Sequence, residues 1–535
     1  MTRSEGAQAV RPLGAQISHM LKARGVEVIF GIPGVHNQEM YRGIEEAGLT
    51  HVLARHEQGA GFMADGYARA TGKPGVAYVI TGPGLCNIMT PMGQAYSDSV
   101  PMLVISSCLD DAVSLRGQLH QMRDQRAAAA TVCEWSEQAP DARAAYALID
   151  RALDEFATAR PRPRHIQVPI RLLEADAPPA PARGEPARRM PAALDLGDLA
   201  ARLACARRPL FILGGGARQP GWRALLNRLG AAVFETYAGR GIVGPDHPLN
   251  FGATLPRPAS AEIVASADLV IAVGTELAEV DLWRDRLGHT APLVRVDIDP
   301  QVLSDRHRAD LRLLADAGDF LRALDRATAD ASPATGWTAQ EATTARARWR
   351  AESDAERPGI VPVCDALRAC TPEGTMIYSD MTQFAYVAKE VWDMDRPGHW
   401  HHPTGFGTLG YALPAAIGGA VARHAAGLPT MAIAGDYGFQ FTLQELGAAV
   451  ELGLPLPIIL WDNGKLGEIE DSMVAAQIAP NAVIAHNPDF CTLARAYGAN
   501  AAAPATLTEM QETVRAAFAA DRPTLIRLTP GLAAA

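Results

Sequence analysis

The sequence contains 535 residues, of which 48% are hydrophobic and 20% are charged, as expected for a globular protein of about three domains. Its 49 Lys and Arg residues against 59 Asp and Glu residues give a net charge of −10, which offers no basic surface for nucleic acid. We expect a cytoplasmic protein without a membrane partner, because there is no apolar run of about 18 residues and no signal-peptide-like apolar core.

Two segments rich in Pro, Ala and Arg divide the chain. The first spans residues 177–191, where the density of proline disfavours helix and strand and predicts an exposed linker. The second spans residues 331–359 and is predicted to begin as a loop and to continue as a polar helix. Three domains are therefore expected, at residues 1–180, 190–330 and 355–535.

Short apolar runs alternate with helical stretches in all three domains. The predicted strands lie, in chain order, within residues 26–34, 75–84, 101–107, 209–217, 269–275, 293–299, 376–380, 430–436 and 455–463. Because these runs are apolar throughout, they are typical of parallel strands that are buried on both faces. With the intervening helices, such as residues 57–72, they predict an α/β fold of three doubly wound parallel-sheet domains. Ligands of such domains bind outside the carboxyl ends of the strands.

Polar side chains follow two strands of the third domain. In TMAIAGDYGFQFTLQELGAAVELGLPLPIILWDNGKLGEI, residues 430–469, one predicted strand leads into Asp436 and the next into Asn463, 27 residues later. A βαβ crossover of this length brings two strand ends together. Carboxylate and amide oxygens suit Mg²⁺, which commonly binds one or two carboxylates plus phosphate oxygens. Gly435 and Gly438 allow a diphosphate to approach the backbone.

This segment and an upstream one resemble the signatures of thiamine diphosphate-dependent enzymes of the acetolactate synthase and 2-oxo acid decarboxylase superfamily. Residues 430–469 are similar to the GDG…NN cofactor motif. HVLARHEQGAGFMADGYARATGKPGVAYVITGPG, residues 51–84, is similar to the helix that activates the cofactor. The resemblance covers nearly the whole chain. It implies pyrimidine-binding, central and diphosphate-binding domains, with thiamine diphosphate and Mg²⁺ as cofactors.

The resemblance also implies roles for individual residues. The side chains of Asp436 and Asn463 and the backbone carbonyl of Lys465 match the Mg²⁺ ligands, and Glu57 matches the glutamate that hydrogen-bonds N1′ of the aminopyrimidine. Tyr437 replaces the usual glycine, and it would be strained if the turn required a positive φ. The other implied cofactor contacts are those of Pro83, Gln383, Gly407 (through its carbonyl), Leu409, Gly435, Tyr437 and Gly438.

Two further expectations concern assembly and flavin. In this family the glutamate and the metal site meet across a subunit interface, so the resemblance implies at least a homodimer, and we expect a tetramer. In acetolactate synthases the central domain holds FAD beside an RFDDR-like run. The corresponding run here, GTELAEVDLW at residues 274–283, lacks the arginine, and Glu276, Glu279 and Asp281 would repel a diphosphate. We therefore expect no FAD.

The segments on the substrate side are most similar to those of 5-guanidino-2-oxopentanoate (2-ketoarginine) decarboxylases. They are FGIPGVHNQEMYRGI at residues 30–44, with Val35 where acetolactate synthases carry a glycine, and LHQMRDQRA at residues 119–127. His120 and Gln121 lie on the loop that lines the pocket in relatives. A histidine there is suited to relay protons.

A carboxylate beyond the metal loop is suited to a cationic substrate tail. Glu468 stands where acetolactate synthases have methionine, and a bidentate pair with a guanidinium is expected there. Glu468 is alternatively a general acid–base residue or the partner of Lys465, and Glu470 or Asp471 is a second candidate for the substrate tail.

Three functions remain open on this basis. The first is the non-oxidative decarboxylation of a 2-oxo acid, best matched by 5-guanidino-2-oxopentanoate giving 4-guanidinobutanal and CO₂. The second is a carboligase of the acetolactate synthase kind, which joins two oxo compounds. The third is a non-catalytic protein that has kept the cofactor fold, against which Glu57, Asp436 and Asn463 argue.

Overall fold

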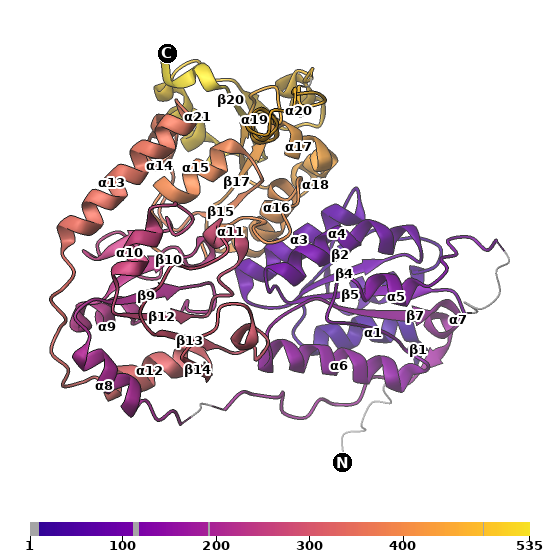
Figure 1. Ribbon diagram of the computed structural model, residues 1–535. Coiled ribbons are helices and arrows are strands. Elements are labelled where there is room, and N and C mark those ends of the chain that lie inside the picture. The colour runs from indigo at the N-terminus through magenta and orange to yellow at the C-terminus, as the bar shows by residue number, and fades with distance from the viewer. Residues whose placement is uncertain (1–9, 111–116, 191–192, 485, 535) are drawn as a thin grey trace.

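The computed structural model describes residues 10–110, 117–190, 193–484 and 486–534. These residues form three six-stranded parallel sheets with helices packed around them, and Figure 1 shows the three resulting domains. The predicted fold class of three doubly wound α/β domains is confirmed. Every helix within the described ranges is too short or too polar to cross a membrane.

The N-terminal sheet has the strand order β3-β2-β4-β5-β7-β6. Its strands are β2 (Val28–Gly31), β3 (Thr50–Leu53), β4 (Gly75–Val79), β5 (Met102–Cys108), β6 (Trp135–Gln138) and β7 (Arg164–Pro169). The helices are α1 (Leu13–Ala23), α2 (Gln38–Glu46), α3 (Glu57–Thr71), α4 (Pro83–Ser97), α5 (Gln125–Ala129), α6 (Ala142–Thr158) and α7 (Ile170–Glu174). A short antiparallel pair joins the two ends of the domain, β1 (Arg11–Pro12) with β8 (Asp176–Ala177).

The middle sheet has the strand order β11-β10-β9-β12-β13-β14. Its strands are β9 (Pro209–Leu213), β10 (Ala232–Glu235), β11 (Asn250–Gly252), β12 (Leu269–Val273), β13 (Leu293–Asp297) and β14 (Leu311–Leu314). The helical segments are α8 (Gly197–Cys205), α9 (Trp222–Leu229), η1 (Tyr237–Gly239), α10 (Ser260–Ser266), α11 (Glu279–Leu282), η2 (Val302–Ser304) and α12 (Ala317–Ala327).

The C-terminal sheet has the strand order β16-β15-β17-β18-β20-β19. Its strands are β15 (Met376–Ser379), β16 (Trp400–His401), β17 (Thr430–Gly435), β18 (Pro457–Trp461), β19 (Asn500–Ala502) and β20 (Thr524–Leu528). The helical segments are α13 (Ala339–Glu356), α14 (Ile360–Cys370), α15 (Gln383–Val391), α16 (Ala412–Arg423), η3 (His424–Ala426), α17 (Asp436–Thr442), η4 (Leu443–Glu445), α18 (Leu446–Glu451), α19 (Gly467–Ala475), α20 (Phe490–Ala496), α21 (Leu507–Phe518) and η5 (Pro530–Ala534).

The two predicted linkers differ in structure. Residues 178–190 contain neither helix nor strand and run along the edge of the molecule in Figure 1, and residue 191 lies outside the described residues. The second linker contains α13, which begins at a capping box. The side chain of Thr338 accepts the N–H of Glu341, whose carboxylate accepts the N–H of Thr338. The expectation of a loop followed by a polar helix is confirmed.

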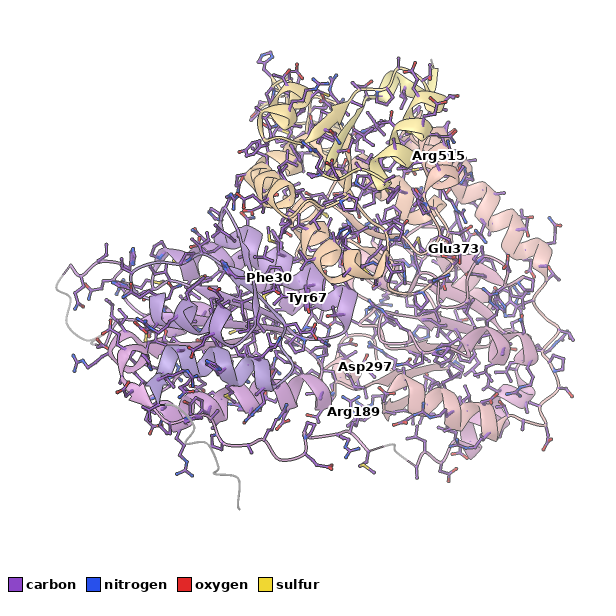
Figure 2. The ribbon with its side chains drawn as sticks, turned by 180° about the vertical axis from the view of Figure 1, so that it is seen from behind. Phe30, Tyr67, Arg189, Asp297, Glu373 and Arg515 are labelled. Atoms are coloured by element: carbon purple, nitrogen blue, oxygen red, sulfur yellow. The ribbon has the colours of Figure 1, made fainter. Side chains whose placement is uncertain are left out.

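The N-terminal and C-terminal domains meet along α3 and α16. On the sheet of its own domain, α3 places Tyr67 edge-on to Phe30 of β2, with ring centroids 5.8 Å apart (Figure 2). Where α3 meets α16, glycines bring the backbones together. A Cβ atom at Gly418 would lie 1.9 Å from the carbonyl oxygen of Met63. No side chain fits there, so the two domains are packed backbone against backbone.

We predict that Gly418→Ala lowers the free energy of unfolding by about 1–3 kcal/mol, the usual cost of overpacking a close contact. The measurement is the midpoint of chemical denaturation. Gly184→Ala is the control, because no atom lies within 4 Å of the Cβ position there. Equal midpoints for the two variants would contradict the close approach of α3 and α16.

Candidate active site

Two neighbouring strands bring the predicted metal ligands together. β17 and β18 are parallel, with Gly435 opposite Trp461, so the residues after both strands emerge at one edge of the sheet. Asp436 is 3% exposed, and burial raises the pKa of its carboxyl group. Asn463 donates from Nδ2 to Oε1 of Gln383, the first residue of α15, at 3.1 Å. Asp436 and Asn463 thus follow adjacent strand ends, as the spacing predicts, and Gln383 lies beside Asn463.

The oxygen atoms of this cluster suit a hard cation. The carboxylate of Asp436 accepts the N–H groups of Tyr437 (3.0 Å) and Gly464 (2.9 Å), and Oδ1 of Asn463 accepts the N–H of Lys465 (3.3 Å). Within the described ranges no group of three His, Cys, Asp or Glu side chains gathers to hold a metal ion. A cation here therefore needs amide, carbonyl and phosphate oxygens beside one carboxylate, which is a ligand set that Mg²⁺ accepts. It would also offset the cost of burying the charge of Asp436.

Asn487, which the sequence analysis missed, orients the carboxylate of Asp436. Its Nδ2 donates to Oδ2 of Asp436 (2.6 Å) and to Oδ1 of Asp462 (2.8 Å). Asp462 also accepts Nε of Arg527 at 2.6 Å. Asp462 is thus satisfied without a metal, although it replaces the first asparagine of the family motif. No sequence pattern indicates Asn487, because it lies in an irregular segment before α20.

Tyr437 is compatible with the local backbone. It lies in the first turn of α17 and does not have a positive φ, so the strain considered from the sequence does not arise. The glycine that is required here is Gly438, where a Cβ atom would lie 2.6 Å from Oδ2 of Asp380. Asp380 accepts the N–H groups of Met381 and Gly410, both at 2.8 Å, and burial raises the pKa of its carboxyl group to about 6.

The loop before α16 carries Gly407 and Leu409. Gly407 is exposed with a φ of 69°, and Leu409 is half-buried. The hydroxyl of Thr408 donates to Oε1 of Gln94 in α4 at 2.9 Å. The loop that is expected to bend the cofactor is thereby attached to the second half of α4.

A second cluster surrounds Glu57 at the carboxyl edge of the N-terminal sheet. Glu57 is the first residue of α3 and is 8% exposed. Its Oε2 accepts Nδ2 of Asn87 at 2.8 Å. A Cβ atom at Gly84 would lie 3.3 Å from Oε1 of Glu57, so the glycine leaves space beside the carboxylate. Pro83, the exposed first residue of α4, adjoins this space.

Two histidines face each other above this edge of the sheet. His120 has a φ of 64°, and its carbonyl oxygen packs against Gly82. Its Nδ1 lies 3.3 Å from Nδ1 of His36, with the rings edge to face. Desolvation, and next the neighbouring His120, lower the pKa of His36. A hydrogen bond between the two facing nitrogens uses one shared proton. His36 directly follows Val35, and no sequence pattern indicates its contact with His120. Gln121, half-buried, lies in the same loop as His120.

The acidic residues of α19 are paired unequally. Both oxygens of Glu468 accept from Arg357, at 2.7 and 2.8 Å, in a bidentate ion pair. Lys465 pairs instead with Glu470, so the alternative of a Glu468–Lys465 pair is wrong. Glu468 is therefore not free to bind a substrate guanidinium. Asp471 is exposed, accepts an amide N–H at 3.3 Å and has no cationic partner among the described residues.

Within one chain, a different part of the C-terminal domain meets the start of α3. The buried carboxylate of Glu445 accepts the N–H of Arg55, at 3.0 and 3.1 Å from its two oxygens, and burial raises its pKa to about 7. Glu57 and Asp436 share no hydrogen-bond partner in the described part of the chain. Glu57 and the loop of Leu409 are attached to different parts of α4. Glu57 accepts from Asn87, whereas Thr408 donates to Gln94, seven residues and about 10 Å further along the helix axis.

Two acids of the run at residues 274–283 in the middle domain have defined surroundings. Glu276 pairs with Arg160 of the N-terminal domain at 2.7 Å. Burial raises the pKa of Asp281 to about 7. The expected absence of FAD stays a prediction.

Comparison with known proteins agrees with the division into three domains. Models of thiamine pyrophosphate enzymes match as an N-terminal TPP binding domain at residues 11–128, a central domain at 196–324 and a C-terminal TPP binding domain at 380–528. "Probable 2-ketoarginine decarboxylase AruI" of Pseudomonas aeruginosa is 44% identical over 96% of this chain and 93% of its own.

More distant relatives carry a different name. "Acetolactate synthase isozyme 2 large subunit" of Escherichia coli is 30% identical over 91% of this chain and 89% of its own. "Probable acetolactate synthase large subunit" of Methanocaldococcus jannaschii is 28% identical over 95% of this chain and 90% of its own.

The buried carboxyl group of Glu445 predicts a pH-dependent stability. Its pKa in the folded protein, about 7, lies above the unfolded value, so its favourable contribution is present at low pH and is lost as the pH rises toward 7. We expect Glu445→Gln to gain stability relative to the wild type as the pH rises from 5 to 7, by about 1.4 kcal/mol per pH unit, and the difference to level off above pH 7. Denaturation midpoints across this range measure the gain. The exposed Glu451→Gln is the control, and a pH-independent difference for Glu445→Gln would contradict the burial of this charge.

Proposed function

We propose, from the premise that this chain belongs to the thiamine pyrophosphate enzyme family, that it decarboxylates 5-guanidino-2-oxopentanoate to 4-guanidinobutanal and CO₂. The enzyme is a thiamine diphosphate-dependent lyase. The observation that carries the choice of substrate is the 44% identity, over 96% of the chain, to a protein named as a 2-ketoarginine decarboxylase. The arrangement of the two clusters supports the same chemistry.

The C-terminal cluster would hold the diphosphate end of the cofactor. Thiamine diphosphate, when bound there, would supply the nucleophile for the keto carbon and the electron sink that the loss of CO₂ requires. Asp436, Asn463 and the carbonyl of Lys465 would bind Mg²⁺, with Asn487 orienting the carboxylate and Gln383 positioned beside Asn463. Supporting this assignment, the only carboxylate of the three ligands is buried, and N–H donors fix the position of both of its oxygens.

The N-terminal cluster would carry out the proton transfers. Glu57, held by Asn87 in a water-poor position, is placed to exchange a proton with N1′ of the aminopyrimidine. The His36–His120 pair, which can share one proton, lies above the same edge of the sheet, next to Gly82. We assign this pair to the delivery of the proton that the product carbon requires after CO₂ has left. Gln121 is assigned to the same wall of the pocket.

The substrate tail would contact α19 and the loop of Val35. Of the three α19 acids, Glu468 is neutralised by Arg357 and Glu470 by Lys465. Asp471 keeps an uncompensated charge, and we assign it, in place of Glu468, to the guanidinium. Val35 is 61% exposed in the single chain, at the other side of the site, where it would leave less room for a second oxo acid than a glycine.

We further propose that the active enzyme is a homo-oligomer, a dimer at least and a dimer of dimers by family resemblance. This proposal is supported by the contacts within one chain, where Glu445 meets the start of α3 and where Glu57 and Asp436 share no hydrogen-bond partner among the described residues. Two copies related by twofold symmetry would complete two sites at once, each from the Glu57 cluster of one chain and the Asp436 cluster of the other.

An acetolactate synthase-like carboligase is the second candidate, because relatives with that name match at 30% identity over 91% of the chain. Such an enzyme would release a C–C-bonded product of two oxo compounds rather than an aldehyde. Mass spectrometry of the products distinguishes the two outcomes.

We expect the wild type to release CO₂ and 4-guanidinobutanal from 5-guanidino-2-oxopentanoate. Asp471→Asn should lower kcat/KM for this substrate about 10- to 100-fold, the effect of losing one charge-assisted hydrogen bond. It should leave a neutral 2-oxo acid of similar length nearly unaffected. Glu468→Gln is the matched control in the same helix, and it should change both substrates in the same ratio.

If the wild type ignores the guanidino acid but converts pyruvate or an aromatic 2-oxo acid well, the substrate assignment fails while the cofactor chemistry stands. If Asp471→Asn changes both substrates equally, Asp471 does not bind the guanidinium.

A further inference from the structure

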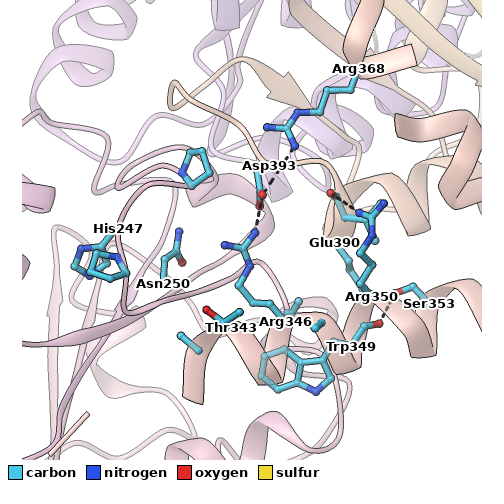
Figure 3. Close-up of a pocket in the computed structure, with 16 residues that line it drawn as sticks. His247, Asn250, Thr343, Arg346, Trp349, Arg350, Ser353, Arg368, Glu390 and Asp393 are labelled. Carbon is cyan, nitrogen blue, oxygen red and sulfur yellow. Dashed lines mark hydrogen bonds and ion pairs between the residues drawn. The ribbon is translucent and has the colours of Figure 1, made fainter. Parts of the chain in front are cut away.

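A cavity of about 350 Å³ lies outside both catalytic clusters, where the middle domain, α13 and the C-terminal domain meet (Figure 3). The loop of His247 and the first residue of β11, Asn250, form one wall. α13 forms the second wall, and the segment from Glu390 to Asp393 forms the third. None of its lining residues belongs to the cofactor or substrate site described above. Its size is in the range of small-molecule sites.

The lining of this cavity is rich in guanidinium groups. Arg346 and Arg350 project from α13 and Arg368 from α14. Arg350 is already paired with Asp365 and donates from Nη1 to the carbonyl oxygen of Val391 at 3.4 Å. Arg346 and Arg368 remain, and Figure 3 shows both directed toward Asp393. Two cationic side chains therefore face the cavity together.

These two guanidiniums share a single carboxylate. Nη2 of Arg346 donates to Oδ2 of Asp393 at 2.6 Å, whereas Nη1 of Arg368 is 3.9 Å from the same oxygen. Within the described ranges the side chain of Arg368 makes no hydrogen bond. The other acid of the lining, Glu390, is already held by Arg257. The lining thus has donor capacity for a second carboxylate or phosphoryl group, which the protein does not provide.

A second observation points to the same missing anion. A water-sized hollow of about 10 Å³ shares Pro245, Asn250, Glu390 and Asp393 with the cavity. Arg240 lines this hollow and is 5% exposed, and its Nη2 has no hydrogen-bond partner among the described residues. Lys389 lines it too, and burial lowers its pKa to about 7. The other two nitrogens of Arg240 donate to the carbonyls of Tyr237 (3.4 Å) and Lys389 (3.1 Å), so Nη2 is the one donor left without an acceptor in the described part of the chain. Leaving a buried donor unsatisfied is costly, and a nearby anion would satisfy it.

We propose that this cavity is a binding site for a small dianion, a dicarboxylate or a phosphate, held between Arg346 and Arg368 and facing Arg240. The bound anion and Asp393 would both lie between the two guanidiniums, so that each cation contacts two anionic groups. Because α13, the middle domain and the C-terminal domain all contribute to the lining, an occupied site would hold the three elements together.

The ligand would also act close to the catalytic region. α13 ends at Glu356, and the next residue, Arg357, holds Glu468 of α19 in the bidentate pair. An anion bound to α13 therefore stabilises the helix whose end is tied to the helix after the metal loop. The site is independent of which 2-oxo acid the enzyme decarboxylates.

The test uses the holoenzyme saturated with thiamine diphosphate and Mg²⁺, with inorganic phosphate and succinate as separate probes and chloride at matched ionic strength. Isothermal titration calorimetry measures the affinity, and thermal unfolding measures stabilisation. We expect about one site per chain with a Kd of about 1 mM or tighter for at least one probe. Arg346→Gln/Arg368→Gln should weaken that binding at least about 10-fold. Arg348→Gln is the control, because Arg348 lies on α13 outside the cavity and pairs with Glu352.

Binding of phosphate alone identifies a phosphate ligand, and binding of succinate alone identifies a dicarboxylate. No binding of either probe up to about 20 mM, or equal binding by the wild type and the double variant, overturns the proposal. If the double variant does not fold, Arg368→Gln alone serves, because the side chain of Arg368 is partly exposed and makes only the 3.9 Å ion pair.

Discussion

The contact between the Glu445 carboxylate and the backbone just before α3 fixes how the Glu57 cluster and the Asp436 cluster are placed within one chain. It brings the C-terminal domain against the helix that begins with Glu57, but through η4 and not through the edge of the sheet that carries Asp436. The close packing of α3 on α16 holds the two domains in this relation. Within one chain the Glu57 and Asp436 clusters share no hydrogen-bond partner among the described residues, which supports the proposal that a second copy completes each site.

Each cluster depends on the register of parallel strands. Pairing of Gly435 with Trp461 places Asp436 and the Asp462–Asn463 pair at one edge of the C-terminal sheet. The same arrangement in the N-terminal sheet places the ends of β2, β4 and β5 side by side. The sheet thus acts as the rigid support, and short loops carry the polar groups, as in other doubly wound domains. Under the proposed function, α19 and the loop of Val35 would select the substrate, and these segments can vary without altering the sheets.

The sequence was sufficient for those features that depend on local pattern. Apolar runs predicted the central strands. The 27-residue spacing predicted that Asp436 and Asn463 follow adjacent strand ends, and the pairing of β17 with β18 confirms this. Residues whose roles depend on distant partners were missed or misjudged. Glu468 is adjacent to the metal loop in sequence, but Arg357, from a different helix, neutralises it. Asn487, His36 and Glu445 became recognisable only when the fold brought their partners into contact. The backbone strain considered for Tyr437 is absent because α17 begins one residue before it, at Asp436, and Tyr437 therefore has a helical backbone.

The most direct test of this account is complementation between two inactive variants. Glu57→Gln and Asp436→Ala should each lose at least about 100-fold in decarboxylation rate. Co-expressed with different affinity tags and purified through both, the hybrid dimer has one site with both substitutions and one intact site. The account predicts recovery of about half the wild-type rate in that hybrid. A hybrid as inactive as its parents would contradict it, because Glu57 and Asp436 would then have to serve the same site from a single chain.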